Sequence, residues 1–135
     1  MRYLALDVGE RYIGVAVSDA GGLLARPLAV FKRTSRVRDF VKVKALIEQH
    51  HAEALVAGLP LNMDGTEGPQ AAWVRDYTAE LAERLALPLH LWDERLTTVT
   101  AAEIMRAQGK APDKSWIDAV AAAVILQSFL DAQHL

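Results

Sequence analysis

The order of the apolar segments along this chain is compatible with only a few folds. Three short apolar runs lie within the first 31 residues, and helix-like and strand-like segments alternate after them. Strands so close in sequence, two of them joined by a Gly-containing turn, favour an antiparallel meander. Strands separated by helices pair in parallel through crossovers. The order therefore predicts an α/β fold with a five-stranded mixed sheet, antiparallel over its first three strands and parallel afterwards, flanked by helices on both faces.

The expected elements follow from apolar periodicity and from turn and cap residues. The expected strands are Tyr3–Leu6, Tyr12–Val17, Leu23–Phe31, Ala54–Ala57 and Leu89–Trp92. The expected helices run from the N-cap Ser35 to His50-His51, from Pro69 to Leu85, from Thr97 or Thr98 to a break at Gly109–Pro112, and over Ser115–Leu130. The last helix is apolar on every side, so we expect it to pack on the sheet. We expect the strands before Asp7 and Glu94 to be central.

The chain has no cysteine, and this absence excludes disulfides, thiolate zinc sites and cysteine nucleophiles. Carboxylates, histidines, lysines and hydroxyl groups remain as candidates for chemistry. At 135 residues the chain fits a single domain, residues 1–135. Its first ten residues include a carboxylate at position 7 and match neither a signal peptide nor a membrane span. We therefore expect a cytoplasmic protein with no membrane partner.

A short basic stripe interrupts a chain whose formal net charge is −2. Against the single acid Asp39, the stripe contains Lys32, Arg33, Arg36, Arg38, Lys42 and Lys44. A charge run of this kind is usually a solvated helix face. Arg36 and Arg38, however, lie at the start of a helix, where the helix dipole disfavours cations. We therefore predict that Arg36, Arg38 and Lys42 contact substrate phosphates.

Acidic residues follow two of the expected strands. Asp7 ends the first strand and precedes Gly9, where a sheet edge opens to ligands, although a turn-capping role explains the same position equally well. Asp93 and Glu94 end the fifth strand. Because side chains alternate along a strand, only one of these two can share the face of Asp7. The longer side chain favours Glu94, but periodicity alone does not decide between them.

Asp118 has two possible roles near the start of the last helix. The spacing Ser115-x-x-Asp118 is a variant of the capping box, whose strict form ends in Glu or Gln. Alternatively, an acid that enters an apolar helix packed on the sheet directs its carboxylate toward the ends of the central strands. Asp7, Glu94 and Asp118 would then supply oxygen ligands for a hard cation, Mg²⁺ or Mn²⁺. Two such ions could activate a water and stabilise the leaving oxygen of a phosphodiester.

The histidines and tryptophans favour structural roles. No metal-ligand spacing connects the four histidines, which are His50, His51, His90 and His134. We expect His90 to be a hydrogen-bonded core residue, because it lies in an otherwise apolar strand. Trp73, Trp92 and Trp116 fall on apolar faces and are expected in the core rather than as base-stacking platforms.

Four motifs follow one another along the chain. The first contains Asp7-x-Gly9-x-Arg11 and Gly14-Val15-Ala16-x-Ser18-Asp19, and the second is Gly58–Thr66. The third is Asp93–Thr98, and the fourth is Lys114-x-x-x-Asp118-x-x-Ala121-Ala122. Together they resemble the YqgF/RuvX family of RNase H-like nucleases over essentially the full length of the chain.

The resemblance implies an RNase H-like fold and a hydrolase, a metal-dependent endonuclease that acts on structured nucleic acid. It carries the catalytic and metal site over to Asp7, Glu94 and Asp118. Arg11, Arg95 and Lys114 belong to the same motifs and are expected to contact substrate, as is the loop Leu61–Gly68.

The resemblance also bears on substrate and assembly. Members of this family look like enzymes of pre-16S rRNA 5′-end maturation in ribosome biogenesis, and Holliday junction resolution in DNA recombination and repair is the alternative. We expect a monomer or a homodimer, because a resolvase needs two active sites that face a two-fold junction.

Two interpretations of a different class stay open. Actin-like sugar kinases and ATPases also begin with an Asp-x-Gly hairpin, but they need a second related half to close over ATP, and this chain is too short for one. A non-catalytic nucleic-acid-binding module would retain binding without metal-dependent turnover. The full set of acids would be unnecessary for such a module.

Overall fold

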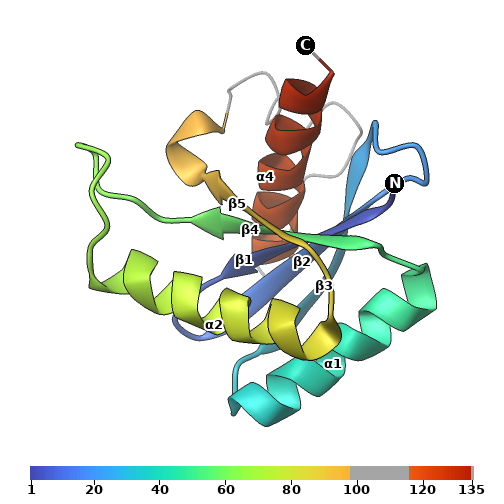
Figure 1. Cartoon of the computed structure of the whole chain (residues 1–135), viewed down its shortest axis with the longest axis horizontal. Helices are drawn as coiled ribbons and strands as arrows, with labels where there is room; N and C mark the ends of the chain where they lie inside the picture. The colour runs from blue at the N-terminus through green and yellow to red at the C-terminus, as the bar shows by residue number, and fades with distance from the viewer. Residues whose placement is uncertain (98–115, 135) are drawn as a thin grey trace.

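The computed structural model of the chain describes residues 1–97 and 116–134. The strands in this part of the chain are β1 Tyr3–Val8, β2 Tyr12–Ser18, β3 Ala25–Lys32, β4 Ala54–Leu59 and β5 Leu89–Asp93. They form one sheet in the order β3-β2-β1-β4-β5 (Figure 1). The pairs β1–β2 and β2–β3 are antiparallel, whereas β1–β4 and β4–β5 are parallel. The predicted mixed sheet is confirmed.

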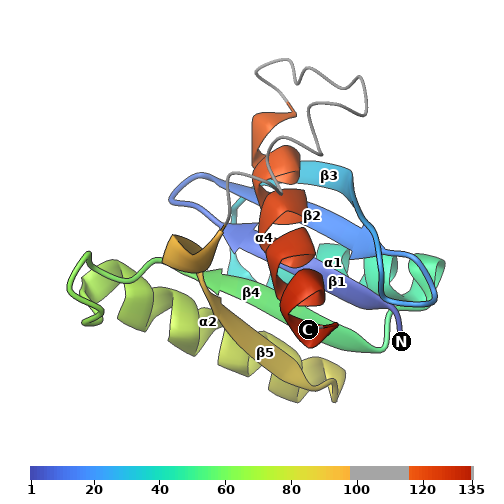
Figure 2. The ribbon, with the colours of Figure 1, turned by 90° about the horizontal axis from the view of Figure 1, so that it is seen from above.

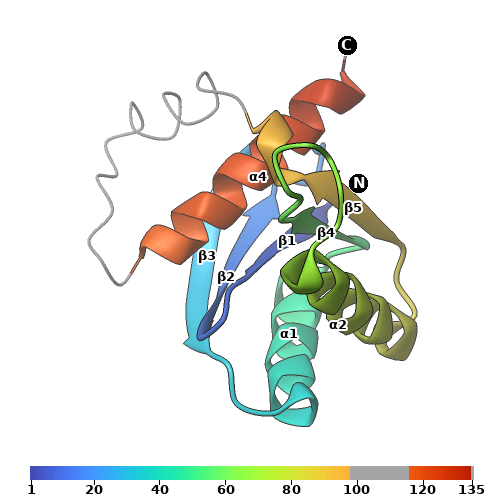
Figure 3. The ribbon, with the colours of Figure 1, turned by 90° about the vertical axis from the view of Figure 1, so that its left-hand side faces the viewer.

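Helices cover both faces of this sheet, as predicted. α1 (Arg36–His50) and α2 (Pro69–Leu85) lie on one face, and α4 (Ile117–Gln133) crosses the other (Figure 2, Figure 3). A short 3₁₀ turn, η1 (Glu94–Leu96), follows β5. The helix expected after Thr98 and its break lie outside the described residues.

The helix starts agree with the cap residues in the sequence. Ser35 is the N-cap of α1, and its hydroxyl accepts a hydrogen bond from the backbone N–H of Arg38 at 3.2 Å. Pro69 is the first residue of α2, a position at which the missing N–H of proline costs nothing.

Side chains along β1 alternate between two cores. Leu4 and Leu6 face α1 and α2 in one core, and Ala5 faces α4 in the other. By the same alternation Asp7 points to the α4 side, while Val8 belongs to the core under α1 and α2. The end of β1 therefore presents a carboxylate on one face of the sheet and an apolar side chain on the other.

Two expectations about β5 are wrong. The strand that holds Asp7 is central, but β5, which precedes Glu94, lies at the edge of the sheet. An edge strand has a neighbour on one side only, so its side chains are less covered, and His90 is exposed rather than a core histidine. The ring centroid of His90 lies 5.2 Å from that of Phe129 on α4.

The tryptophans lie at the margins of the cores. Trp73 packs against the core under α1 and α2, and Trp92 packs against the core under α4, as predicted. Trp116 is half-buried at the N-cap of α4. No helix of the described residues combines the length and the apolar character that crossing a bilayer requires.

Candidate active site

Asp7 lies on the central strand β1, beside the place where the first turn of α4 meets the sheet. Its register partner on β2 is Gly14. A Cβ added to Gly14 would overlap the backbone carbonyl of Asp118, so only glycine permits this approach. The contact brings Asp7 and Asp118 together from elements that are far apart in the sequence.

Asp93 and Glu94 point in different directions at the end of β5. Asp93 is the N-cap of η1 and binds Arg95: the guanidinium Nη2 is 2.6 Å from Oδ2, and the backbone N is 2.9 Å from Oδ1. The Arg95 side chain holds the pKa of Asp93 below its ordinary value. Glu94 turns toward β4, where a Cβ on Gly58 would lie 2.6 Å from its Oε1. Glu94, not Asp93, therefore faces Asp7.

The carboxyl groups of Asp7 and Glu94 form a hydrogen bond in which Glu94 is the donor. Burial, and then the charge of Asp7, raises the pKa of Glu94 to about 7. Burial, and then the charge of Asp118, raises the pKa of Asp7. Without a cation nearby, the two groups share a proton, because two adjacent carboxylates repel each other.

Asp118 occupies the first turn of α4, whose N-cap is Trp116. Within the described residues no side chain caps this helix end by a hydrogen bond. Ser115, the first residue of the predicted capping box, lies outside the described residues, so that interpretation is not tested. The backbone of Asp118 lies against Gly14, the register partner of Asp7, and the charge of Asp118 raises the pKa of Asp7.

The donor set of this acidic cluster fits a hard divalent cation, since such ions prefer carboxylate oxygens. No Lys or Arg of the described residues forms an ion pair with Asp7 or Glu94. In the same part of the chain, no three His, Asp or Glu side chains are already arranged around one point as ligands. Release of the shared proton is the change that would let Asp7 and Glu94 act together as ligands.

A cavity of about 290 Å³ lies beside this pair. Its polar wall contains Asp7, Glu94 and Thr97, and α4 supplies the apolar wall with Ala121, Val124 and Ile125. The buried hydroxyl of Thr97 has no hydrogen-bond partner among residues 1–97 and 116–134, and an unpaired buried polar group is rare. Sequence reasoning treated Thr97 only as a possible helix start, and its place in the third motif was the one signal that it belongs here.

Two of the predicted substrate contacts lie near the acidic cluster. Arg11 is exposed in the turn between β1 and β2, and Arg95 follows Glu94 directly. The Nη1 of Arg95 donates to the carbonyl oxygen of Met63 at 3.1 Å. This contact connects the loop Leu61–Gly68 to the end of β5, so the loop lies beside the candidate site.

Three of the other predicted contacts, Arg36, Arg38 and Lys42, lie on α1, and Arg36 is already engaged. Arg36 donates to Asp76 at 3.0 Å and to Glu80 at 2.9 Å, which ties α1 to α2. Arg38 and Lys42 are exposed. Lys114 lies outside the described residues.

Comparisons with known proteins agree with this architecture. Residues 1–132 match the family model RuvX: Holliday junction resolvase. A relative from Thermoanaerobacter pseudethanolicus is 43% identical over 136 residues, with 98% of each chain covered. A relative from a Roseiflexus species is 45% identical over 135 residues, with 98% of this chain and 96% of that one covered. Both are named "Putative pre-16S rRNA nuclease".

Solved structures show the same fold at low identity. Thermus thermophilus RuvC superposes with a TM-score of 0.68 at 18% identity, covering 99% of this chain and 96% of that one. The large terminase nuclease from the thermophilic phage G20c gives a TM-score of 0.57 at 16% identity, covering 95% and 81%.

The mixed five-stranded sheet, with Asp7 at the end of its central strand, has an RNase H-like fold. The chain belongs to the RuvX family. Membership in a nuclease family excludes the actin-like kinase interpretation. Nucleases of this fold generally use divalent metal ions.

Proposed function

We propose that this protein is a divalent-metal-dependent endonuclease that hydrolyses phosphodiester bonds in structured nucleic acid. The observation that carries the proposal is the Asp7–Glu94 pair, two carboxyl groups joined by a proton, with the charge of Asp118 beside it. Adjacent acids without cationic partners are unfavourable unless a proton or a cation neutralises them. Mg²⁺ or Mn²⁺ suits a site of carboxylate oxygens.

In this proposal Asp7, Glu94 and Asp118 hold the metal through carboxylate oxygens. A divalent ion bound there would generate a hydroxide nucleophile and stabilise the leaving oxygen. Binding of the ion would require Glu94 to release to solvent the proton that it shares with Asp7. Thr97 offers a neutral hydroxyl beside the pair, and Val124 and Ile125 exclude water from one wall of the cavity.

We propose pre-16S rRNA 5′-end maturation in the cytoplasm as the biological role, supported by the names of relatives that are 43% and 45% identical. Holliday junction cleavage in DNA recombination and repair is the second candidate, supported by the description of the family. Junction cleavage requires a homodimer with two sites facing a two-fold axis, whereas a monomer suffices for rRNA.

We propose that phosphates of the substrate contact Arg11, Arg36, Arg38, Lys42, Arg95 and Lys114. Arg36 shares its guanidinium with Asp76 and Glu80, so we expect it to contribute least.

The salt dependence of binding tests these contacts. In a plot of the logarithm of the binding constant against the logarithm of the salt concentration, each lost phosphate contact lowers the steepness of the slope by about 0.7 to 0.9. Arg38→Gln and Lys42→Gln should each do so, and Lys44→Gln, which removes a partner of Glu48, is the matched control. If the slope is unchanged in both Arg38→Gln and Lys42→Gln, the basic stripe is a solvated helix face and does not contact phosphates.

The deciding experiment compares a pre-16S 5′-leader RNA, single-stranded DNA and a four-way junction with Mg²⁺, with Mn²⁺ and in excess EDTA. We expect metal-dependent cleavage of the leader RNA. Cleavage of the junction alone, by a dimer, would favour the resolvase. Binding without turnover would identify a non-catalytic module, and cleavage undiminished by EDTA would exclude the metal mechanism.

A further inference from the structure

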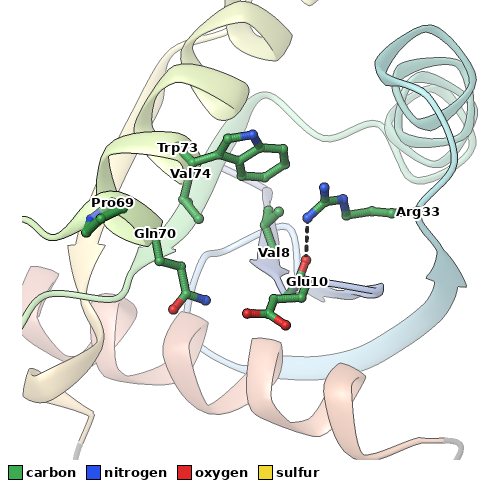
Figure 4. A pocket seen from close by; sticks show the side chains of 8 residues that line it. Val8, Glu10, Arg33, Pro69, Gln70, Trp73 and Val74 are labelled. Atoms are coloured by element: carbon green, nitrogen blue, oxygen red, sulfur yellow. Dashed lines mark hydrogen bonds between the residues drawn. The ribbon is translucent and has the colours of Figure 1, made fainter.

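A second pocket lies at the same end of β1, on the opposite face of the sheet from the acidic cluster (Figure 4). It is bounded by the β1–β2 turn, the segment before α1 and the first turns of α2. Its volume of about 400 Å³ lies in the range of small-molecule sites. The walls that matter here are Val8, Glu10, Arg33, Gln70, Trp73 and Val74.

Arg33 is fixed in the wall of this pocket by two contacts. Its Nη1 donates to the carbonyl oxygen of Gly9 at 2.7 Å, and its guanidinium carbon lies 4.0 Å from the centroid of the Trp73 ring. No carboxylate of the described residues forms an ion pair with Arg33. A half-buried guanidinium that points into the pocket therefore keeps N–H donors and a charge for an anionic ligand.

Trp73 forms the aromatic wall and is held in place by its neighbours. It stacks on Tyr77 with the ring centroids 5.0 Å apart and an interplanar angle of 25°. Val8 and Val74, both at most 4% exposed, supply apolar surface next to it. Tyr77 and the guanidinium of Arg33 pack on this ring, so a flat aromatic ligand in the pocket would meet it edge to face rather than stacked.

Two polar side chains complete the pocket. The amide of Gln70 can donate and accept hydrogen bonds, and the carboxylate of Glu10 accepts them. Both lie on the side of the pocket away from the Trp73 ring (Figure 4). A free anion alone would be opposed by Glu10 and the apolar walls, and a purely apolar molecule would leave three polar groups unpaired.

We propose that this pocket binds one nucleotide of the substrate strand, with the base against Trp73, its polar edge at Gln70 and Glu10, and its phosphate at Arg33. The inference rests on the proposed function, because the strand cleaved at Asp7 and Glu94 supplies the nucleotide. Asp7 and Gly9 are separated along the chain by roughly 7 Å at the rise of a strand. A strand that passes round the end of β1 can therefore reach both sites, and the pocket would set the position of cleavage.

The first test measures nucleotide binding apart from catalysis. The full chain with Asp7→Asn, in EDTA, is titrated with each of the four ribonucleoside monophosphates and with inorganic phosphate while tryptophan fluorescence is recorded. We expect quenching by at least one nucleotide, none by phosphate, and a Kd about fivefold higher in Gln70→Ala, the loss of one hydrogen bond. Gln49→Ala, an exposed glutamine on α1, is the matched control, and Trp73→Phe should remove the signal.

The second test decides whether the nucleotide comes from the substrate. A 5′-leader RNA with a single abasic site, moved through the sequence, is bound to the Asp7→Asn protein. We expect one position, close to the cleavage site, where loss of the base weakens binding in the parent background and not with Gln70→Ala. If free nucleotides quench the fluorescence but no abasic position weakens binding, the pocket does not bind a nucleotide of the substrate strand. If free nucleotides do not quench and the abasic scan is uniform, the pocket does not bind nucleotides. Neither result depends on cleavage, so a failure of the proposed nuclease activity is seen separately.

Discussion

Two aspartates on opposite sides of the sheet, Asp39 and Asp7, differ in the partners that surround them. Asp39 on α1 is 1% exposed and accepts hydrogen bonds from the Tyr77 hydroxyl at 2.9 Å and from the backbone N–H of Thr34 at 3.0 Å. The side-chain partner of Asp7 is another acid, Glu94. Hydrogen-bond donors around a buried carboxylate stabilise its charge, so the carboxylate can serve the fold alone. A buried carboxylate with acidic neighbours needs a proton or a cation to neutralise the repulsion. Burial alone therefore does not identify the functional acid.

The largest expected effect is on cleavage. Asp7→Asn should lower the rate by more than about 100-fold, the upper end of what the loss of an outer-shell partner costs a metal site. Asp39→Asn, the same substitution, should cleave at close to the parent rate. Single-turnover cleavage with Mg²⁺ measures both. If Asp39→Asn lost as much activity as Asp7→Asn, the contrast between the two acids would not hold.

The order of the two variants reverses for stability in EDTA. Asp39→Asn should lose about 1.5 to 3 kcal/mol, because hydrogen bonds to a charged group are replaced by weaker ones and one donor faces an amide. That loss corresponds to a melting temperature lower by roughly 5 to 10 °C in a chain of this length. Asp7→Asn should melt at the parent temperature or above it, since it removes charge from an acidic cluster. Thermal melts followed by circular dichroism decide the question, and a destabilised Asp7→Asn would count against repulsion in the cluster.

Metal should stabilise the parent through the same cluster. At a Mn²⁺ concentration 100 times the Kd, binding to the folded state contributes about 2.7 kcal/mol. Asp118→Asn should lose much of this gain together with its activity, and Asp39→Asn should keep all of it. Melts with and without Mn²⁺ test the expectation. An active Asp118→Asn protein with full Mn²⁺ stabilisation would show that Asp118 only caps α4.

The last expected effect is a pH dependence of the metal-free protein. Burial and the charge of Asp7 raise the pKa of Glu94 from its ordinary 4.5 to about 7, so the fold favours the protonated form. The stability that this proton provides is complete below about 4.5 and is lost as the pH rises through about 7.

Melting temperatures in EDTA should therefore fall between these pH values in the parent, and the fall should be smaller in Glu94→Gln. Subtracting one profile from the other removes the contribution of the histidines. Parallel profiles would show that Glu94 titrates as an ordinary exposed acid.

Local sequence patterns were sufficient for much of this molecule. The turn chemistry and the short spacing of the first strands predicted the meander, and Ser35 and Pro69 predicted two helix starts. Each of these features depends on residues within a few positions of one another. The family resemblance then pointed to the same acids.

Long-range packing set the limits of sequence reasoning. Periodicity could not choose between Asp93 and Glu94, because the choice depends on the contacts of Glu94 with Gly58 on β4 and with Asp7 on β1. An apolar sequence did not show that β5 is an edge strand, so His90 was misplaced. Arg33 belonged to a charge run, and only its contact with Gly9, 24 residues away, puts it in a pocket.

The approach of α4 to β2 at Gly14 has a consequence for judging relatives of this protein. A single methyl group at position 14 would push the start of α4 outward, and Asp118 would move with it. Such a protein would retain every acidic residue in its sequence and yet lose the approach of Asp118 to Asp7 on which the proposed site depends. A relative that has all three acids but lacks this glycine should therefore be treated as a candidate pseudoenzyme until its cleavage activity is measured.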